Sequence, residues 1–101
     1  MLTADLIIHS VTVYDVANLD ADRNPVYGAG VTMPCRLEPI DARVRSQLGI
    51  QNADAMTIYS NSELKAGQRV DWMTKHFTVS NVKACYALDG NAPHHWEGQL
   101  I

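Results

Sequence analysis

Residues 68–79, QRVDWMTKHFTV, decide how we interpret the fold of this chain. Two short apolar runs, at 70–72 and 77–79, flank a polar and flexible segment. This pattern predicts a β-hairpin, with Thr74 and Lys75 at its turn. No acid, base or nucleophile stands beside the hairpin in an arrangement suited to catalysis. We therefore expect the hairpin to be scaffold, and the working part of the molecule to lie elsewhere.

Large apolar side chains are expected to form that scaffold, because aromatic residues bury large areas and a small barrel needs a few of them inside. A base-stacking platform for single-stranded nucleic acid is the alternative use of Trp72, Phe77, Tyr86 and Trp96. Such a platform needs basic neighbours, and only Arg69, Lys75 and Lys83 lie nearby in sequence. Core packing is favoured, with Trp72 and Phe77 largely buried. The expected core scaffold is Trp72, Phe77, Val79 and Trp96.

Length and composition indicate one folded domain over residues 1–101, with 47% hydrophobic residues and a net charge of −3. No apolar run is long enough to span a membrane, and the first residues lack a signal-peptide pattern. The acidic balance argues against a protein that grips nucleic acid by neutralising many phosphates. Cys35 and Cys85 each lie within a strand-like run and are expected to be small buried hydrophobes in a reducing compartment.

Alternation of apolar and polar residues predicts strands at 5–14 and 31–37. Pro34 cannot donate to a ladder, so the second strand is expected to lie on an edge or to carry a bulge there. Residues 15–30, DVANLDADRNPVYGAG, are rich in turn-forming residues at more length than a tight hairpin needs. We expect a long exposed loop between the two strands.

Residues 40–49 break the alternation, since Ile40, Val44 and Leu48 recur every four residues. Asp41 before them and Gly49 after them suit the two caps of a short helix. Further strands are predicted at 55–60, 76–88 and 94–101, with a turn at 89–93. The predicted fold class is mainly β: a small antiparallel barrel or sandwich with one short inserted helix or loop.

Residues with catalytic or metal-binding side chains are few. His94, His95 and Glu97 have metal-ligand chemistry, and His9 and His76 could add nitrogens. Neighbouring residues of a strand face opposite ways, so His95 and Glu97 could share a face while His94 could not join them without a bulge. The pattern favours outward-facing polar residues, no metal or other cofactor, and no enzyme.

The order of these features resembles the small head-closure proteins of tailed bacteriophages, the head–tail joining or stopper family. The stretch RVDWMTKHFTVSNV is the most telling, because family members commonly show an apolar residue, Trp or a similar residue, a tight turn, a Phe and then an apolar pair followed by Val. One departure is the first turn, 15–30, which is longer than the Asp-rich, Gly-containing turn of the family. The matching stretches are VTMPCRLEPI (31–40), AMTIYS (55–60), LKAGQRVDWMTKHFTVSNV (64–82) and HHWEGQLI (94–101).

The resemblance implies a structural protein of the virion neck, assembled in the bacterial cytoplasm. Its subunits would form a homo-oligomeric ring, of six or twelve copies, below the portal and adaptor proteins and above the tail or tail-terminator proteins. The ring would close the DNA-filled head and touch packaged double-stranded DNA transiently, with no membrane contact.

The family places its gating loop between the strands that correspond to 31–37 and 55–60, which here is the segment 39–56. In the alternative interpretation, Ile40, Val44 and Leu48 pack a surface helix onto the barrel end. The expected residues of the channel or gating loop are Arg43, Arg45, Ser46, Gln47, Gln51 and Asn52.

Three other functions stay open on sequence alone. A tail terminator or tail-completion protein is a related neck role. An oligonucleotide-binding barrel for single strands would use the aromatic residues, and a small metal-dependent or cupin-like enzyme would use the histidines.

Overall fold

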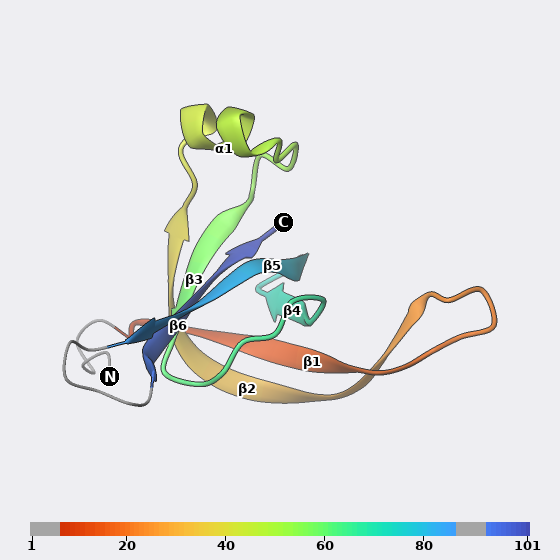
Figure 1. The fold of residues 1–101 in the computed structure, drawn as a ribbon. Coiled ribbons are helices and arrows are strands. Elements are labelled where there is room, and N and C mark those ends of the chain that lie inside the picture. The colour runs from red at the N-terminus through yellow and green to blue at the C-terminus, as the bar shows by residue number, and fades with distance from the viewer. Residues whose placement is uncertain (1–6, 87–92) are drawn as a thin grey trace.

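The computed structural model describes residues 7–86 and 93–101, and these form a closed antiparallel barrel with strand order β1-β2-β3-β6-β5-β4 (Figure 1). The predicted mainly β fold is confirmed, as a barrel rather than a sandwich. The predicted order of two strands, one helix and four strands also holds. Of the predicted turn at 89–93, residues 89–92 lie outside the described residues and Pro93 begins β6. The elements are β1 (His9–Leu19), β2 (Pro25–Pro39), α1 (Ala42–Leu48), β3 (Met56–Ser60), β4 (Arg69–Trp72), β5 (Lys75–Tyr86) and β6 (Pro93–Leu100).

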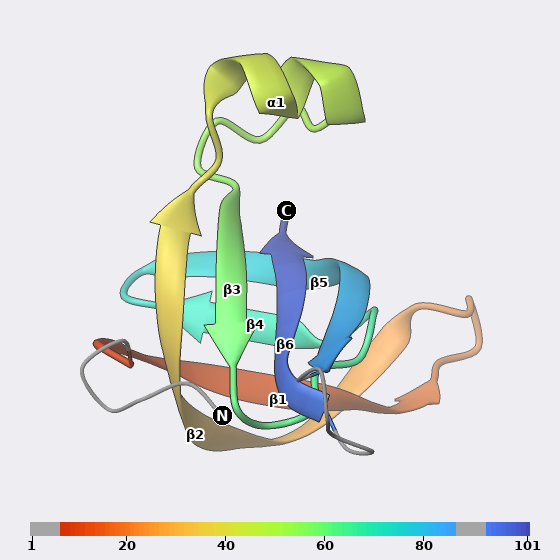
Figure 2. The same cartoon turned by 60° about the vertical axis from the view of Figure 1, so that its left-hand side comes forward.

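Two long strands close the barrel by changing partners along their length. β2 pairs with β1 as far as Cys35 and with β3 from Arg36 onward. β5 pairs with β4 as far as Thr78 and with β6 from Val79 onward. Figure 2 shows the result, with β2, β3 and β6 crossing β1, β4 and β5 at a steep angle. Each long strand therefore forms a corner of the barrel.

The inward positions of the strands form one core of aliphatic residues around Phe77. Ile58, Val70 and Leu100 are fully buried, as period-two alternation on these short strands requires. The cluster is Val11, Val13, Met33, Cys35, Leu37, Met56, Ile58, Leu64, Val70, Phe77, Val79 and Leu100.

The tryptophans lie at the edge of this core rather than inside it. Phe77 and Val79 are buried as expected, but Trp72 and Trp96 are only partly buried and pack against the cluster. Trp72 therefore packs against the core as expected, although it is less completely buried than Phe77. Trp72 is the last residue of β4, where its ring lies edge-on against His9 at a centroid distance of 5.9 Å.

The turn of the β4–β5 hairpin lies one residue earlier than the sequence predicts. Trp72 pairs with Lys75, so Met73 and Thr74 form a two-residue turn. Met73 has φ of 55°, a left-handed conformation that a two-residue hairpin turn demands and that glycine usually supplies. The sequence signal was weak because neither turn residue is a Gly, Asn or Asp.

Residues 15–30 are a hairpin rather than a loop, which corrects the sequence prediction. β1 continues to Leu19 and β2 begins at Pro25, with register shifts near Val16. Asp20 shapes the tip, where its Oδ1 accepts hydrogen bonds from the backbone N–H groups of Asp22 (2.9 Å) and Asn24 (2.8 Å). The two strands leave the barrel together, so most of their side chains are exposed and no apolar alternation marks them.

Pro34 lies where β2 has a neighbour on one side only. It pairs with Ser10 of β1, and the ladder to β3 begins two residues later, at Arg36. The expected edge position is confirmed locally, even though the barrel as a whole is closed.

Burial predicts a clear order for the two aromatic residues of the hairpin. Phe77→Ala should lower the free energy of unfolding by about 3–5 kcal/mol, because it removes a buried aromatic ring from the core. Trp72→Ala should cost less, roughly 1–3 kcal/mol, because its ring is only partly removed from water. Urea denaturation followed by circular dichroism measures both. A Trp72 variant destabilised as much as the Phe77 variant would contradict this picture of the core.

Candidate functional site

The segment between β2 and β3 is an insertion tied to the barrel at its base. Pro39 pairs with Met56, and the N–H of Ile40 donates to the carbonyl oxygen of Ala55 at 3.2 Å. The chain thus leaves and rejoins the barrel at one point, and α1 stands away from the strands (Figure 1). We call residues 40–55 the helical insertion.

Local capping explains why the insertion is helical. The Oδ1 of Asp41 accepts a hydrogen bond from the N–H of Arg43 at 2.7 Å, as expected for an N-cap. Gly49 ends the helix in the left-handed region with φ of 72°. The predicted helix at 40–49 is confirmed, with α1 covering Ala42–Leu48.

The helix buries none of its own residues. Val44 and Leu48, which recur every four residues, are 42% and 49% exposed. The alternative in which Ile40, Val44 and Leu48 pack the helix onto the barrel end is therefore not what the structure shows, because only Ile40 of the three is partly buried while Val44 and Leu48 stay exposed. The four-residue spacing correctly indicated a helix, but its apolar face buries no residue against the part of the chain that the structure describes.

The six residues expected in a gating loop all lie on the insertion, and five of them are exposed: Arg43, Ser46, Gln47, Gln51 and Asn52. Arg45 is the exception. It is partly buried, and its Nε has no hydrogen-bond partner among the described residues. Residues two apart on a helix point in different directions. Arg43 is therefore exposed to solvent, whereas Arg45 is partly buried.

The end of the insertion rests loosely against the barrel. An ion pair of 3.1 Å joins Lys75 Nζ to Asp54 Oδ1, and both side chains are about half exposed. A groove of about 390 Å³ separates the two parts and is lined by Leu48, Gly49, Ile50, Gln51, Asn52, Ser80, Asn81, Gln99 and Ile101. The contact between insertion and barrel is therefore incomplete.

A second projection is formed by the outer parts of β1 and β2, residues 15–29, which we call the hairpin arm (Figures 1 and 2). Its exposed residues include Val16, Leu19 and Val26, at 41%, 58% and 42%. Its base is held by Gln68 Nε2, which donates to Asp15 Oδ1 at 2.6 Å. The arm therefore carries apolar side chains that remain substantially exposed to solvent.

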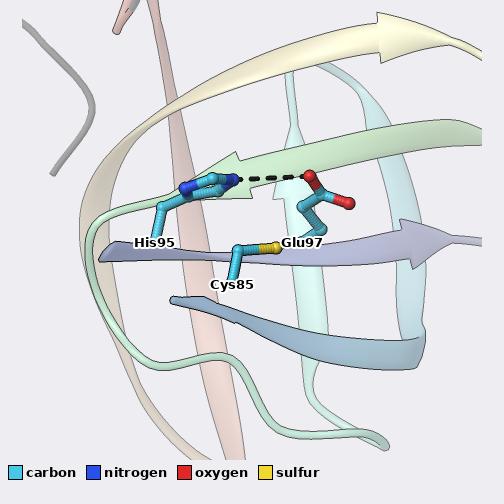
Figure 3. Close-up of side chains that lie close together, drawn as sticks. All are labelled: Cys85, His95 and Glu97. Atoms are coloured by element: carbon cyan, nitrogen blue, oxygen red, sulfur yellow. Dashed lines mark hydrogen bonds and ion pairs between the residues drawn. The ribbon is translucent and has the colours of Figure 1, made fainter. Parts of the chain in front are cut away.

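A third feature lies on the outer face of β5 and β6, where Cys85, His95 and Glu97 come together (Figure 3). One ligand atom from each lies within 4.8 Å of the other two. His95 Nε2 is 3.3 Å from Glu97 Oε1, and His95 Nδ1 is 2.9 Å from Nδ1 of His94. The expectation that His95 and Glu97 share a face is confirmed, and we call these three residues the Cys–His–Glu cluster.

The other two histidines lie elsewhere. His9 Nδ1 accepts a hydrogen bond of 3.1 Å from the N–H of Leu37. His76 Nδ1 lies 2.7 Å from Asp71 Oδ1, and Arg69 holds the pKa of that carboxyl below its usual range by hydrogen bonding to it. Neither histidine can join the cluster on β6.

A row of polar side chains continues from the cluster across the outer face. Tyr59 pairs with Glu97 on one side and with Arg36 on the other. Arg36 Nε and Glu38 Oε1 form an ion pair of 2.9 Å. Partial burial and the nearby carboxylates of Glu38 and Glu97 raise the pKa of the Tyr59 hydroxyl. Arg36, Glu38 and Tyr59 therefore interact with one another on this face.

The aromatic residues do not form one stacking surface. Phe77 faces the interior, whereas Tyr86 is 61% exposed on the outside. Trp72 and Trp96 lie at the edge of the core. An oligonucleotide-binding platform made of all four is therefore inconsistent with the structure.

No family model, curated protein or solved structure matches this chain. Within the described residues, no helix is long and apolar enough to cross a membrane.

Sequence reasoning missed two parts of these sites. Cys85 was expected to be a buried hydrophobe, but it is only partly buried, beside His95. Only the strand pairing of β5 with β6 brings the two together. The hairpin arm was missed because exposed strands lack the alternation of apolar and polar residues.

The two cysteines should differ in reactivity. Burial raises the pKa of the Cys35 thiol to about 11, while partial burial and Glu97 raise that of Cys85 more modestly. We expect an aromatic disulfide reagent at pH 8 to modify one thiol per native chain, and the second only in urea. Cys85→Ser should abolish the native-state reaction. Equal rates for both thiols in the native protein would contradict this placement.

Proposed function

We propose that this chain is a structural neck protein of a tailed bacteriophage, which forms a ring below the portal and adaptor, closes the DNA-filled head and docks the tail. The observation that carries the proposal is the helical insertion, tethered at Pro39 and Met56 between β2 and β3. The resemblance to head-closure proteins places a gating loop between the corresponding strands. A closed barrel that holds both ends of a projecting segment is suited to this task.

The insertion can move at little energetic cost. It buries no residue of α1, and its ion pair to the barrel is exposed, which limits that pair to about 0–1 kcal/mol. The barrel core, by contrast, is one continuous cluster that must stay intact. A gate needs a segment of this kind, whose rearrangement leaves the fold unchanged.

The charge of the chain suits a channel through which DNA slides. The net charge of −3 keeps overall attraction to phosphates low. Arg43 is exposed on the insertion, so a ring would present it once per subunit. A few such contacts touch the DNA backbone without holding it, because affinity grows with the number of phosphates neutralised.

The hairpin arm supplies a contact between subunits in this proposal. Ring contacts are heterologous, so a surface on one subunit meets a different surface on the next. Val16, Leu19 and Val26 are exposed on the arm. The arm also projects away from the barrel, which gives the subunit a reach beyond its own core (Figure 1).

A tail terminator or tail-completion protein is the second candidate, because such a ring also combines a rigid barrel with projecting segments. The insertion favours head closure, since a terminator needs no gate. In either role the partners are further copies of the chain and the neighbouring neck proteins, in a virion assembled in the bacterial cytoplasm. Electron microscopy of the protein mixed with the portal and adaptor of its phage would distinguish the two positions.

Shortening residues 43–52 to a brief Gly/Ser turn tests the gate. The barrel should remain folded, because α1 contributes no buried residue. The variant should still join the portal, yet filled heads should lose DNA. Nuclease sensitivity of the packaged genome measures the loss.

A matched control keeps the length of the insertion and changes only Arg43→Gln and Arg45→Gln. Heads with this variant should retain DNA better than heads with the shortened insertion, since the segment itself still obstructs the channel. Heads that stay full with the shortened insertion would place the gate elsewhere.

Removing the apolar side chains of the arm tests the ring contact. Leu19→Ser with Val26→Ser should change the free energy of unfolding by no more than about 0.5 kcal/mol, because both side chains are exposed. The same change should lower the occupancy of rings on the portal, counted by electron microscopy. Normal rings from this double variant would show that the arm is not a subunit contact.

A further inference from the structure

The Cys–His–Glu cluster has the composition of a metal site. Zn²⁺ in proteins binds thiolate sulfur, imidazole nitrogen and carboxylate oxygen, and one of each is present. Sequence alone favoured no metal here, because only His95 and Glu97 share a face of β6. Cys85 completes the set from the neighbouring strand, where it pairs directly with His95.

The spacing is close to that of a tetrahedral site. Metal–ligand bonds of about 2.0–2.3 Å place tetrahedral donor atoms about 3.3–3.8 Å apart. His95 Nε2 and Glu97 Oε1 are already 3.3 Å apart, and all three donors lie within 4.8 Å. Small side-chain rotations, without movement of the strands, would bring the sulfur into range.

His94 supplies the supporting contact that such a histidine needs. Its Nδ1 lies 2.9 Å from Nδ1 of His95, so one of these nitrogens must donate to the other. When His95 Nδ1–H donates to His94, His95 Nε2 carries a free lone pair on the side of Cys85 and Glu97. A hydrogen bond at the other ring nitrogen is how proteins orient a metal-binding histidine.

The surroundings leave room for an ion to enter. All three residues are partly exposed, and a fourth position can be filled by water. Lys83 pairs with Glu97 across the strands and is the nearest competing cation along the β5 ladder. Because Lys83 is exposed, its ammonium can turn toward solvent.

We propose that Cys85, His95 and Glu97 bind one Zn²⁺ ion on the outer face of the barrel, with water as the fourth ligand and His94 as a positioning residue. The ion would join β5 to β6 and stabilise the folded chain, since the unfolded chain does not hold the three ligands together. This inference is independent of the proposed neck function.

Titration of the untagged, reduced protein with Co²⁺ tests the ligand set. We expect one equivalent to bind and to produce a thiolate-to-cobalt charge-transfer band. Cys85→Ser should abolish the band, while Cys35→Val, which changes the buried thiol, should retain it. A band that survives in Cys85→Ser, or no band in the wild-type protein, would overturn the site.

Thermal unfolding with and without Zn²⁺ provides a second readout. Zn²⁺ should raise the midpoint of the wild-type protein and of His76→Ala, whose histidine lies outside the cluster. It should not raise the midpoint of His95→Ala. His94→Gln should weaken Zn²⁺ binding by about 10–100-fold, as expected for a supporting residue. An equal Zn²⁺ shift in His95→Ala would show that the ion binds elsewhere.

Discussion

The closure of the barrel through β2 and β5 is the constraint on which the rest of the structure depends. Each of these strands serves two neighbours in turn, and the change of partner falls at Cys35–Arg36 and at Thr78–Val79. Hydrogen bonds in both directions between Thr78 and Ile101, of 3.0 and 3.1 Å, seal the second corner. Closure removes the free edges that a six-stranded sheet would otherwise expose, so one small core suffices.

Closure of the barrel also determines which segments lie outside the core. Every residue of the buried cluster lies on the strands or on the loop before β4, and none on α1 or on the hairpin arm. The helical insertion and the arm therefore contribute little to the stability of the fold. They can change conformation or contact other molecules without a matching loss in the core, a division that a ring-forming channel protein needs.

Sequence pattern predicted the parts in which one face is buried. Val11, Val13, Ile58 and Leu100 alternate with polar residues because the barrel interior covers one side only. The caps at Asp41 and Gly49 marked the helix for local reasons. The same alternation wrongly indicates a buried side chain at Val31. This residue continues the alternation of Met33 and Cys35, but it is 67% exposed because the strand extends beyond the core there. The pattern failed for the same reason along the hairpin arm.

Contacts between side chains of different strands could not be predicted from the sequence pattern of either strand alone. The Cys–His–Glu cluster depends on the register that places Cys85 opposite His95, and nothing in either segment fixes that register. The partial burial of Trp72 likewise depends on where β4 ends relative to the core. The sequence thus showed which residue types were present, but the pairing of β5 with β6 decides what they can do.

The pairing of β5 with β6 is irregular, as is the pairing of β1 with β2 in the hairpin arm. This irregularity gives the proposed zinc ion a structural role. Its register shifts between Ser80 and Lys83 and again between Cys85 and Tyr86. Asn81 lies in the first irregularity with φ of 52°, and its side chain donates to Gln99 Oε1 at 2.6 Å. A side-chain contact therefore spans the ladder at the first shift. The Cys–His–Glu cluster lies at the second shift, where a metal ion would hold the two strands together in the same way.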